Sequence, residues 1–315
     1  MVTIIAEPNY APHAIQMYRS LGPVYFWFDL SAKERVRVSK IANILVVRLA
    51  VTVSKNLIDS MPKLKIVATS TTGLNHIDVE YLKEKRIKLI SLRGQTSFLK
   101  NIPSTAEETM ALMLGVMRRI PWAFEHVKQG KWDPNRWTGN ELKGKTLGII
   151  GFGRLGTLVA GYARSFGMHV IAADPYVSQN VMGRQVKKVS LEKLLKESDV
   201  VSLHVLLTDA TENMLTEKHF KSMKRSAYFI NTARAELIKP GVLYKALTKK
   251  WIAGAGIDVL HSEKSDASHL KKDSLVRYAK AHENLLIAPH MGGTTHEAKE
   301  ITQIFLADLV FSALE

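Results

Sequence analysis

Three glycines in this chain have the spacing of a loop that binds a dinucleotide. Gly151, Gly153 and Gly156 form a GxGxxG pattern between the apolar run TLGII and the helical pattern TLVAGYARSFG. Glycines permit a tight turn and close approach of the backbone to a pyrophosphate, and the following helix offers free N–H groups to phosphate. Asp174 ends the next strand, HVIAA, where a carboxylate can accept hydrogen bonds from ribose hydroxyls. Because that carboxylate would repel a 2′-phosphate, and no lysine or arginine follows before Arg184, the motif favours NAD over NADP.

Three further residues could carry the chemistry of a nicotinamide enzyme. Such an enzyme needs a group that exchanges the hydroxyl proton and a cation that holds an anionic substrate near the hydride acceptor. Arg234 follows the run AYFIN, and we expect it to bind the carboxylate and carbonyl oxygens of the substrate. His290 follows the run LLIAP and is the expected acid/base. Glu263, five residues beyond Asp258, would stabilise the imidazolium and fix the ring tautomer.

The elements that must position these residues are short β-branched runs, which alternate with longer helical patterns along the whole chain. This alternation is typical of parallel α/β layers. The first third contains four expected strands, at 2–6, 43–47, 65–69 and 88–92, and the remainder contains six, at 146–150, 169–173, 200–204, 227–231, 254–258 and 285–289. The later six are spaced by roughly one βα unit, so they predict a doubly wound Rossmann sheet. The candidate residues would then lie at the carboxyl ends of its strands, where such sheets bind ligands.

The predicted fold class is α/β with two domains. A polar segment near residue 97 separates the two series of strands, and a helix is expected over 103–119 with its N-cap at Ser104. The last stretch, 294–315, has the pattern of an amphipathic helix that could pack back on the first domain. Its apolar face is expected to contain Ile301, Ile304, Phe305, Leu309 and Phe311. We therefore expect one domain of residues 1–97 plus 294–315 and a dinucleotide-binding domain of residues 98–293.

The composition narrows the class of protein. The chain has 44 lysines and arginines against 29 acidic residues, a formal net charge of +15 that would suit a nucleic-acid binder. These cations are scattered in pairs beside apolar segments, however, so a solvated surface is favoured and no nucleic-acid partner is expected. No apolar run reaches the roughly 20 residues of a membrane helix. Without a signal-peptide pattern or any cysteine, the chain is expected to be cytoplasmic, with no metal site.

At these motifs the sequence resembles the D-isomer-specific 2-hydroxyacid dehydrogenases over nearly its whole length. That family's catalytic trio is an arginine in NxAR, a glutamate five residues past the aspartate of GxxxDV, and a histidine in PHxGG. Arg234, Glu263 and His290 match it in that order. The segments around GFGRLG and SFGMHVIAADPY look most like short-form phosphoglycerate dehydrogenases and hydroxypyruvate reductases. The resemblance implies a flavodoxin-like substrate-binding domain beside the Rossmann domain. It also implies NAD-dependent interconversion of a small D-2-hydroxy acid and its 2-oxo acid.

The resemblance assigns roles to further residues. The implied cofactor contacts are Arg154 and Leu155 at the pyrophosphate, Thr232, Ala233 and Asp258 around the nicotinamide amide, and Val205 and Gly293 elsewhere along the cofactor. His204 is expected to be a neighbour of the cofactor rather than a base. Backbone N–H groups near Thr72 and Gly73 are implied to bind the substrate carboxylate from the other domain.

Departures from the family pattern affect the assignment of the substrate. Ala235 replaces the last glycine of NTARG, and Leu206 replaces the proline of HxP, so a loop near the cofactor can differ in shape. Phosphoglycerate dehydrogenases carry arginines that meet the substrate phosphate around the positions of Thr69 and Pro134, and only Arg48 matches a basic position of this kind. Arg48 is therefore a candidate substrate-binding residue. Hydroxypyruvate, glyoxylate and other small 2-oxo acids all stay open as substrates.

Two other functions stay open. Transcriptional corepressors of this fold keep the trio and use NAD to set their assembly, and phosphite dehydrogenases share the trio as well. A dehydrogenase is favoured over a corepressor because no partner-docking segment is evident in the chain.

The resemblance also implies a homodimer formed by the cofactor domain, with residues 102–140 at the interface. The apolar segment MALMLGVM and three tryptophans, Trp122, Trp132 and Trp137, support this expectation because aromatic residues are enriched at interfaces.

Overall fold

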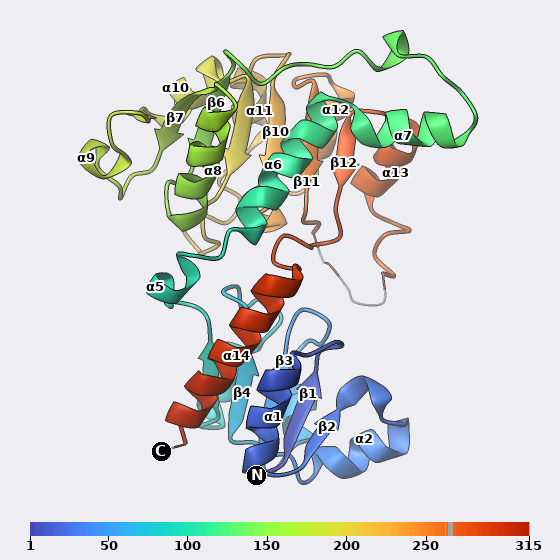
Figure 1. Ribbon diagram of the computed structural model, residues 1–315, viewed down its shortest axis with the longest axis vertical. Helices are drawn as coiled ribbons and strands as arrows, with labels where there is room; N and C mark the ends of the chain where they lie inside the picture. Colours follow the sequence, from blue (N-terminus) through green and yellow to red (C-terminus); the bar gives the residue numbers. More distant parts are fainter. Residues whose placement is uncertain (262, 264–266, 315) are drawn as a thin grey trace. The chain divides into compact units, whose positions relative to one another are not determined.

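The computed structural model describes residues 1–261, 263 and 267–314, and it divides into two units (Figure 1). Unit 1 comprises Met1–Asn101 and the C-terminal segment from Thr294, and unit 2 comprises Ile102–Glu263 and Ala267–Gly293. The sequence pattern placed the first boundary at 97/98, whereas the structure has it between Asn101 and Ile102. Both units are parallel α/β layers, which confirms the predicted fold class.

Unit 1 is built on a parallel sheet of five strands in the order β2-β1-β3-β4-β5. The strands are β1 Thr3–Ala6, β2 Val24–Phe26, β3 Ile44–Val47, β4 Ile66–Thr69 and β5 Lys88–Ser91. The helices are α1 Pro12–Leu21, α2 Ala32–Ser39, α3 Lys55–Asp59, α4 Val79–Glu84, α5 Thr96–Leu99 and α14 His296–Ser312, with a 3-10 turn η1 at Trp27–Asp29. This strand order is that of flavodoxin-like sheets.

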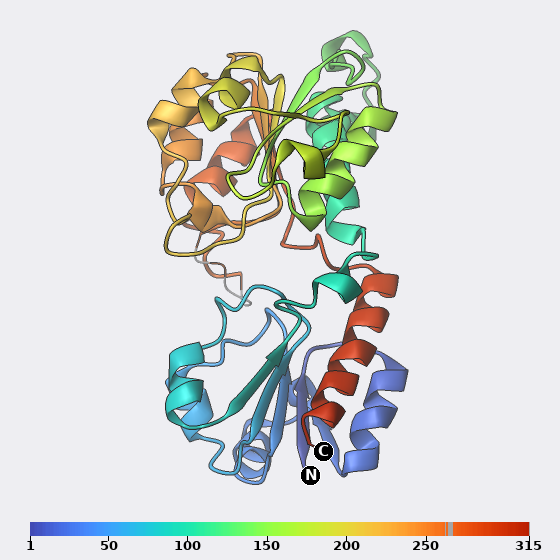
Figure 2. The same cartoon turned by 90° about the vertical axis from the view of Figure 1, so that its left-hand side faces the viewer.

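Alternate residues of the strands of unit 1 face two apolar layers. On one face, Ile5 of β1 and Val46 of β3 pack against α1 and α14; on the other, Ile4 and Leu45 pack against α2, α3 and α4. Figure 2 shows α1 and α14 side by side on the first face. Strand β2 was not predicted, because its three residues follow α1 without a longer apolar run.

The C-terminal helix packs within unit 1, but not wholly with the expected face. Its buried apolar residues are Ala298, Leu306, Ala307 and Val310. Ile301 is exposed, and Ile304, Phe305, Leu309 and Phe311 are only partly buried. The prediction of that face was wrong for Ile301, whereas Ile304 and Leu309 do pack at the edge of the core cluster and Phe305 stacks on Phe98. The closest approach to the sheet is made by smaller side chains such as Ala307 and Val310.

Unit 2 is built on a parallel sheet of seven strands in the order β12-β11-β10-β9-β6-β7-β8. The strands are β6 Thr146–Ile150, β7 His169–Ala173, β8 Lys187–Lys188, β9 Val200–Leu203, β10 Tyr228–Asn231, β11 Gly254–Ile257 and β12 Leu285–Ile287. The helices are α6 Ser104–Met117, α7 Ile120–Lys128, α8 Arg154–Ser165, α9 Gln179–Met182, α10 Leu191–Glu197, α11 Glu217–Ser222, α12 Val242–Thr248 and α13 Ser274–Ala281, with 3-10 turns η2 Asn135–Trp137 and η3 Ala235–Leu237. The order reverses between β6 and β9, as in a Rossmann sheet.

Three expectations about unit 2 need correction. The two-residue strand β8 adds a seventh strand to the six predicted. The N-cap of α6 is Pro103, not Ser104, and no side chain caps this helix. The MALMLGVM segment is buried in the unit's own core, where Met113 and Met117 pack with Leu147 and Ile149 of β6.

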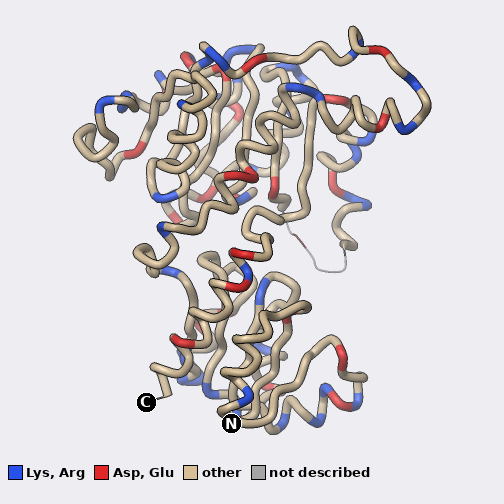
Figure 3. The backbone as a smooth tube through the Cα atoms, viewed as in Figure 1, with Lys and Arg blue, Asp and Glu red and all other residues tan. Residues whose placement is uncertain are grey.

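The described basic residues of the chain form no single patch. Lysines and arginines are distributed over both units rather than gathered in one stripe (Figure 3). In the part of the chain that the structure describes, no helix combines the length and apolarity needed to cross a bilayer.

Candidate active site

The glycine loop joins β6 to α8 in the backbone geometry that its sequence predicts. Gly151 has a φ of 89°, and a Cβ there would lie 2.9 Å from the carbonyl of His204. A Cβ on Gly156 would lie 2.3 Å from the oxygen of Gly151, so this helix packs too closely for any side chain. At Gly153, the N-cap of α8, a Cβ would meet nothing within 4 Å, and no side chain caps the helix. The exposed N-terminus of α8 is therefore open to an anion.

Asp174 lies at the end of β7 and is tied to the glycine loop. Its Oδ2 accepts a hydrogen bond from the Phe152 N–H at 2.8 Å, and its Oδ1 accepts from the N–H groups of Tyr176 at 2.8 Å and Val177 at 3.1 Å. The carboxylate therefore also holds the loop in place, a role that the sequence pattern did not indicate. Oδ2, which accepts only one of these three hydrogen bonds, keeps acceptor capacity for a ribose hydroxyl.

Arg234 lies between β10 and η3, where it is the N-cap residue of η3, and its loop is held by Asn231. The Asn231 amide donates to the Arg234 carbonyl at 3.0 Å and accepts from the Ala233 N–H at 2.9 Å. The Arg234 guanidinium donates to the carbonyl of Ala233 at 2.7 Å. Burial lowers the pKa of Arg234, while Glu236, Glu263 and Asp258 oppose that shift. These carboxylates favour the charged form of the half-buried guanidinium, which offers N–H donors to an anion.

Glu263 and His290 form the shortest contact between functional side chains. His290 Nδ1 and Glu263 Oε2 are 2.6 Å apart, and the Leu260 N–H donates to the other oxygen, Oε1, at 2.7 Å. Burial raises the pKa of Glu263. This rise is outweighed by the hydrogen bond and charge of His290, by the Leu260 N–H and by Arg234, so the net shift of the Glu263 pKa is downward. The carboxylate is thus held ionised against the ring, leaving Nε2 of His290 as the nitrogen that can exchange a proton with a ligand.

Asp258 shapes the loop that carries His290. It is buried, and its two oxygens accept hydrogen bonds from the N–H groups of Met291 at 2.7 Å and Gly292 at 2.8 Å. His290 has a φ of 54°, a left-handed conformation that costs energy for a residue with a side chain. The aspartate therefore helps to hold a strained loop. Burial raises the pKa of Asp258, although the two N–H groups and His290 act to lower it.

Residues after β9 and β10 complete this edge of the sheet. His204 Nε2 contacts the Ser202 hydroxyl at 2.8 Å, and burial lowers the His204 pKa to about 4. Its Nδ1 is buried without a partner among the described residues. Val205 lies close to Gly151, and Thr232 shares a buried hydrogen bond of 2.8 Å with Thr109 of α6.

Two predicted residues serve the protein itself in this structure. The Arg154 guanidinium donates to the Ile102 carbonyl at 2.8 Å, so at least one of its arms is directed at the start of unit 2. Leu155 packs into the apolar core beneath α8. The backbone N–H groups of both residues lie in the first turn of α8, where a helix N-terminus can bind a phosphate.

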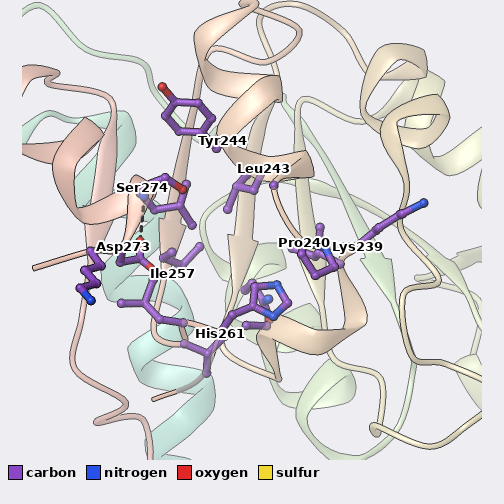
Figure 4. A pocket seen from close by; sticks show the side chains of 16 residues that line it. Lys239, Pro240, Leu243, Tyr244, Ile257, His261, Asp273 and Ser274 are labelled. Atoms are coloured by element: carbon purple, nitrogen blue, oxygen red, sulfur yellow. Dashed lines mark hydrogen bonds between the residues drawn. The ribbon is translucent and has the colours of Figure 1, made fainter. Parts of the chain in front are cut away.

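A cavity of about 410 Å³ lies behind the loops of Arg234 and Glu263 (Figure 4). Asn231 and Leu260, which hold those two residues, line it, whereas Arg234, Glu263 and His290 do not. Figure 4 shows Leu243, Ile257 and His261 around this space. The cavity is therefore separate from the trio and borders its supports.

In unit 1, the predicted substrate residues follow β3 and β4. The Arg48 guanidinium contacts the Thr294 hydroxyl at 3.3 Å and Glu7 at 3.7 Å. Thr72 is half-buried and Gly73 is buried, with the Gly73 carbonyl accepting from the Thr71 hydroxyl at 2.7 Å. Among the described residues, no three metal-ligating side chains gather in one place.

The family model of the NAD-binding domain of D-isomer-specific 2-hydroxyacid dehydrogenases matches residues 110–292. This chain belongs to that family. Its unit 2 is the NAD-binding domain, and the family is one of NAD-dependent oxidoreductases.

Relatives and solved structures of the family cover the chain in full or nearly so. The chain is similar to a D-3-phosphoglycerate dehydrogenase of Methanocaldococcus jannaschii, at 34% identity over all of this chain and 58% of the relative. It is 36% identical to a hydroxypyruvate reductase of Thermotoga maritima over 90% of this chain and 89% of the relative. A D-lactate dehydrogenase from Aquifex aeolicus, complexed with NAD and lactic acid, superposes with a TM-score of 0.82 at 28% identity, covering 100% of this chain and 95% of that one.

The residues of this family member fit NAD. The space at Gly153, the uncapped N-terminus of α8 and the remaining acceptor capacity of Asp174 suit phosphate and ribose. The unpartnered nitrogen of His204 beside Gly151 is a further buried group that a ligand or water can satisfy.

Asn231 and Thr109 are supporting residues that sequence reasoning missed. Asn231 is the polar end of an otherwise apolar strand, which is a signal that could have identified it. Thr109 gave no such signal, because its contact with Thr232 joins residues that are 123 positions apart.

Proposed function

We propose that this protein catalyses NAD-dependent interconversion of a small D-2-hydroxy acid and its 2-oxo acid. The observation that carries the proposal is the placement of Arg234, Glu263 and His290 after adjacent strands β10, β11 and β12, with the Glu263–His290 contact of 2.6 Å. When bound, NAD supplies or accepts the hydride. The chain's own residues bind the substrate and move the proton.

In this proposal each member of the trio has one task. Arg234 holds the substrate carboxylate and polarises its carbonyl as negative charge develops there. Nε2 of His290 donates a proton to the carbonyl oxygen during reduction and accepts it during oxidation. Glu263 keeps the imidazolium and its orientation through Nδ1. Thr72 and Gly73 are proposed to bind the substrate carboxylate through backbone N–H groups.

We also propose that NAD is preferred over NADP because of Asp174. The carboxylate is half-exposed at the end of β7, where it can accept from ribose hydroxyls and would repel a 2′-phosphate. The other proposed cofactor contacts are those of the family at Gly151, Thr232, Ala233, Asp258 and Gly293.

The substrate class follows from the relatives and from Arg48. The relatives' names include hydroxypyruvate reductase and D-3-phosphoglycerate dehydrogenase, and the chain spans only 58% of the length of the latter. Arg48, the residue that matches a phosphate-binding position of the family, already contacts Glu7. We therefore propose an unphosphorylated substrate such as hydroxypyruvate or glyoxylate.

A screen of NADH oxidation tests the proposal. The compounds are glyoxylate, hydroxypyruvate, pyruvate, 2-oxoglutarate and 3-phosphohydroxypyruvate, with NADPH as the cofactor control. Turnover of at least one 2-oxo acid with NADH is expected. NADH binding without turnover of any 2-oxo acid would instead favour an NAD-sensing protein of the corepressor type.

We further propose a homodimer in which α7 contributes to the interface. The expected MALMLGVM face is used within the core, but Ile120, Phe124 and Val127 lie at helical spacing on α7 and are 54%, 60% and 48% exposed. Trp132, 84% exposed, follows them in the chain. An exposed apolar stripe of this kind is typical of a protein interface.

A cytoplasmic location, where NAD and 2-oxo acids meet, is also proposed and can be tested by cell fractionation.

A further inference from the structure

A buried carboxylate flanks the point where the strand order of unit 1 reverses. From β1 the sheet grows in one direction to β2 and in the other to β3. Glu7 directly follows β1, and Arg48 directly follows β3. In open parallel sheets, ligands bind at the carboxyl ends of the two strands where the order reverses. Glu7 and Arg48 therefore lie where a ligand of unit 1 is most expected.

Two cations share this carboxylate. Oε1 of Glu7 is 3.7 Å from Nη1 of Arg48 and 3.9 Å from Nζ of Lys299, which comes from α14. The side chains of Arg48 and Lys299 are 19% and 21% exposed, whereas that of Glu7 is 4% exposed. A ligand from solvent would thus meet the cations before the carboxylate, and the three groups together carry one positive charge.

The carboxylate is not locked into this arrangement by hydrogen bonds. Neither oxygen of Glu7 has a hydrogen-bond partner among the described residues, and the same holds for the nearby Nε2 of Gln303. Gln303 uses its other amide atom, Oε1, to accept from the Ala11 N–H at 2.7 Å. Burial raises the pKa of Glu7, and the charges of Arg48 and Lys299 only partly oppose this rise. A buried charge that is only partly compensated costs stability. For a ligand, the effect of Glu7 is to offset part of the positive charge of Arg48 and Lys299.

We propose that Glu7 sets the charge selectivity of substrate binding, favouring 2-oxo acids with one negative charge over phosphorylated ones. This inference rests on the proposed function, in which Arg48 contributes to substrate binding. Hydroxypyruvate brings no charge beyond the carboxylate that Arg234 is proposed to hold. A phosphorylated 2-oxo acid brings further negative charge, which the ionised Glu7 repels.

The test is the ratio of kcat/KM for 3-phosphohydroxypyruvate to that for hydroxypyruvate, measured at pH 8. In Glu7→Gln, which keeps the shape but removes the charge, this ratio should rise by about tenfold or more, mainly through a lower KM for the phosphorylated compound. The kcat for hydroxypyruvate should stay near that of the wild type. Adding Arg48→Gln to Glu7→Gln should abolish the gain.

Asp59→Asn is the matched control. Asp59 ends α3, which leads back to the amino edge of the same sheet, and it pairs there with Lys85 at 3.3 Å. It removes the same charge from unit 1 and should leave the ratio unchanged. An unchanged ratio in Glu7→Gln, or an equal rise in Asp59→Asn, would overturn the proposal.

Two further measurements keep the test independent of folding and of the proposed function. If Glu7→Gln does not fold, Lys299→Gln should lower the ratio, and no change in that variant overturns the inference. If the wild type reduces no 2-oxo acid, the proposed function fails. Inorganic phosphate should still bind more tightly to Glu7→Gln than to the wild type by calorimetry, and equal affinity would overturn the role of Glu7.

Discussion

At the residue scale, the site depends on side chains whose charge is set by their nearest contacts. Glu263 is ionised because His290, the Leu260 N–H and Arg234 together outweigh its burial. His290 is presented by a strained backbone with a φ of 54°, which Asp258 helps to hold. Strain of this kind persists only where the surrounding structure compensates for it, and it is common at functional sites.

The role of His290 can be tested by removing its proton transfer while keeping its size. His290→Gln should bind NADH normally but lose turnover by about 10²–10⁴-fold, as expected for the loss of a positioned proton donor. Fluorescence titration measures the binding, and steady-state kinetics on the best 2-oxo acid measures the turnover. Near-normal turnover in this variant would show that another residue is the acid/base.

Glu263 predicts the direction of a pH shift. Contact with His290 helps to lower the pKa of Glu263, so a charged carboxylate faces the ring at neutral pH, and Glu263→Gln removes that charge. The midpoint of the pH profile for the reductive reaction should therefore move toward acid, with a milder loss of activity at low pH. Profiles of kcat from pH 5 to 9 measure this, and a shift toward alkaline pH would contradict the assigned contact.

Glu7 predicts how the stability of unit 1 changes with pH. Burial raises its pKa in the folded protein above the usual 4.5, so the folded state binds more protons than the unfolded state in that range. The free energy of unfolding should then fall as pH rises from about 4.5 toward neutral, and Glu7→Gln should lack this fall. Thermal unfolding midpoints of the two proteins from pH 4 to 8 provide the comparison. Parallel curves would contradict the raised pKa.

At the scale of elements, the sheet edge of unit 2 gathers the site because its strands are parallel and in Rossmann order. Residues after β6, β7, β9, β10, β11 and β12 come to one edge, where each is supported by a neighbouring loop. Asp174 illustrates the coupling between elements, since it ends β7 and accepts from Phe152 in the loop after β6. A change at one strand end therefore affects the next.

The cofactor preference is a prediction about this edge. Asp174→Ala should narrow the preference for NADH over NADPH by about one to two decades, since a hydrogen bond to a charged group contributes roughly 1.5–3 kcal/mol. The measurement is kcat/KM for each cofactor. Asp174→Asn, which retains an acceptor for the Phe152 N–H, should narrow it as well if charge is the cause. Equal or better use of NADPH by the wild type would refute the assignment.

At the scale of the whole molecule, the described residues of unit 2 leave the apolar face of α7 largely exposed. The α7 residues Ile120, Phe124 and Val127 are exposed, while the base of their segment is tied down by Arg119 and Arg136, which both pair with Glu283 at 3.0 Å. A rigidly attached apolar stripe is suited to contact a second copy of the chain.

This stripe predicts the oligomeric state. The wild type should have the mass of a dimer in light scattering at micromolar concentration. Phe124→Glu, which places a charge in the centre of the stripe, should shift it toward the monomer. Glu125→Gln on the same helix, where Glu125 pairs with Lys128 at 2.9 Å, is the control and should remain dimeric. A monomeric wild type would contradict the interface.

The sequence by itself determined the features that depend on local pattern. Strands β6 and β7 match their predicted runs residue for residue, because a buried parallel strand requires a continuous apolar run. The glycine spacing, Asp174 and the proposed trio are likewise predictions from the sequence, since each follows such a run. The family was also identified from them.

Only the tertiary structure decided which distant residues meet. One group joins Glu7 after β1, Arg48 after β3 and Lys299 in α14. In another, Thr109 contacts Thr232, which lies 123 positions away in the sequence. The buried face of α14 and the burial of Met113 and Met117 were decided in the same way. Hydrophobic period shows that a face is buried but not which surface covers it. That depends on strand order and helix packing, which join segments hundreds of residues apart.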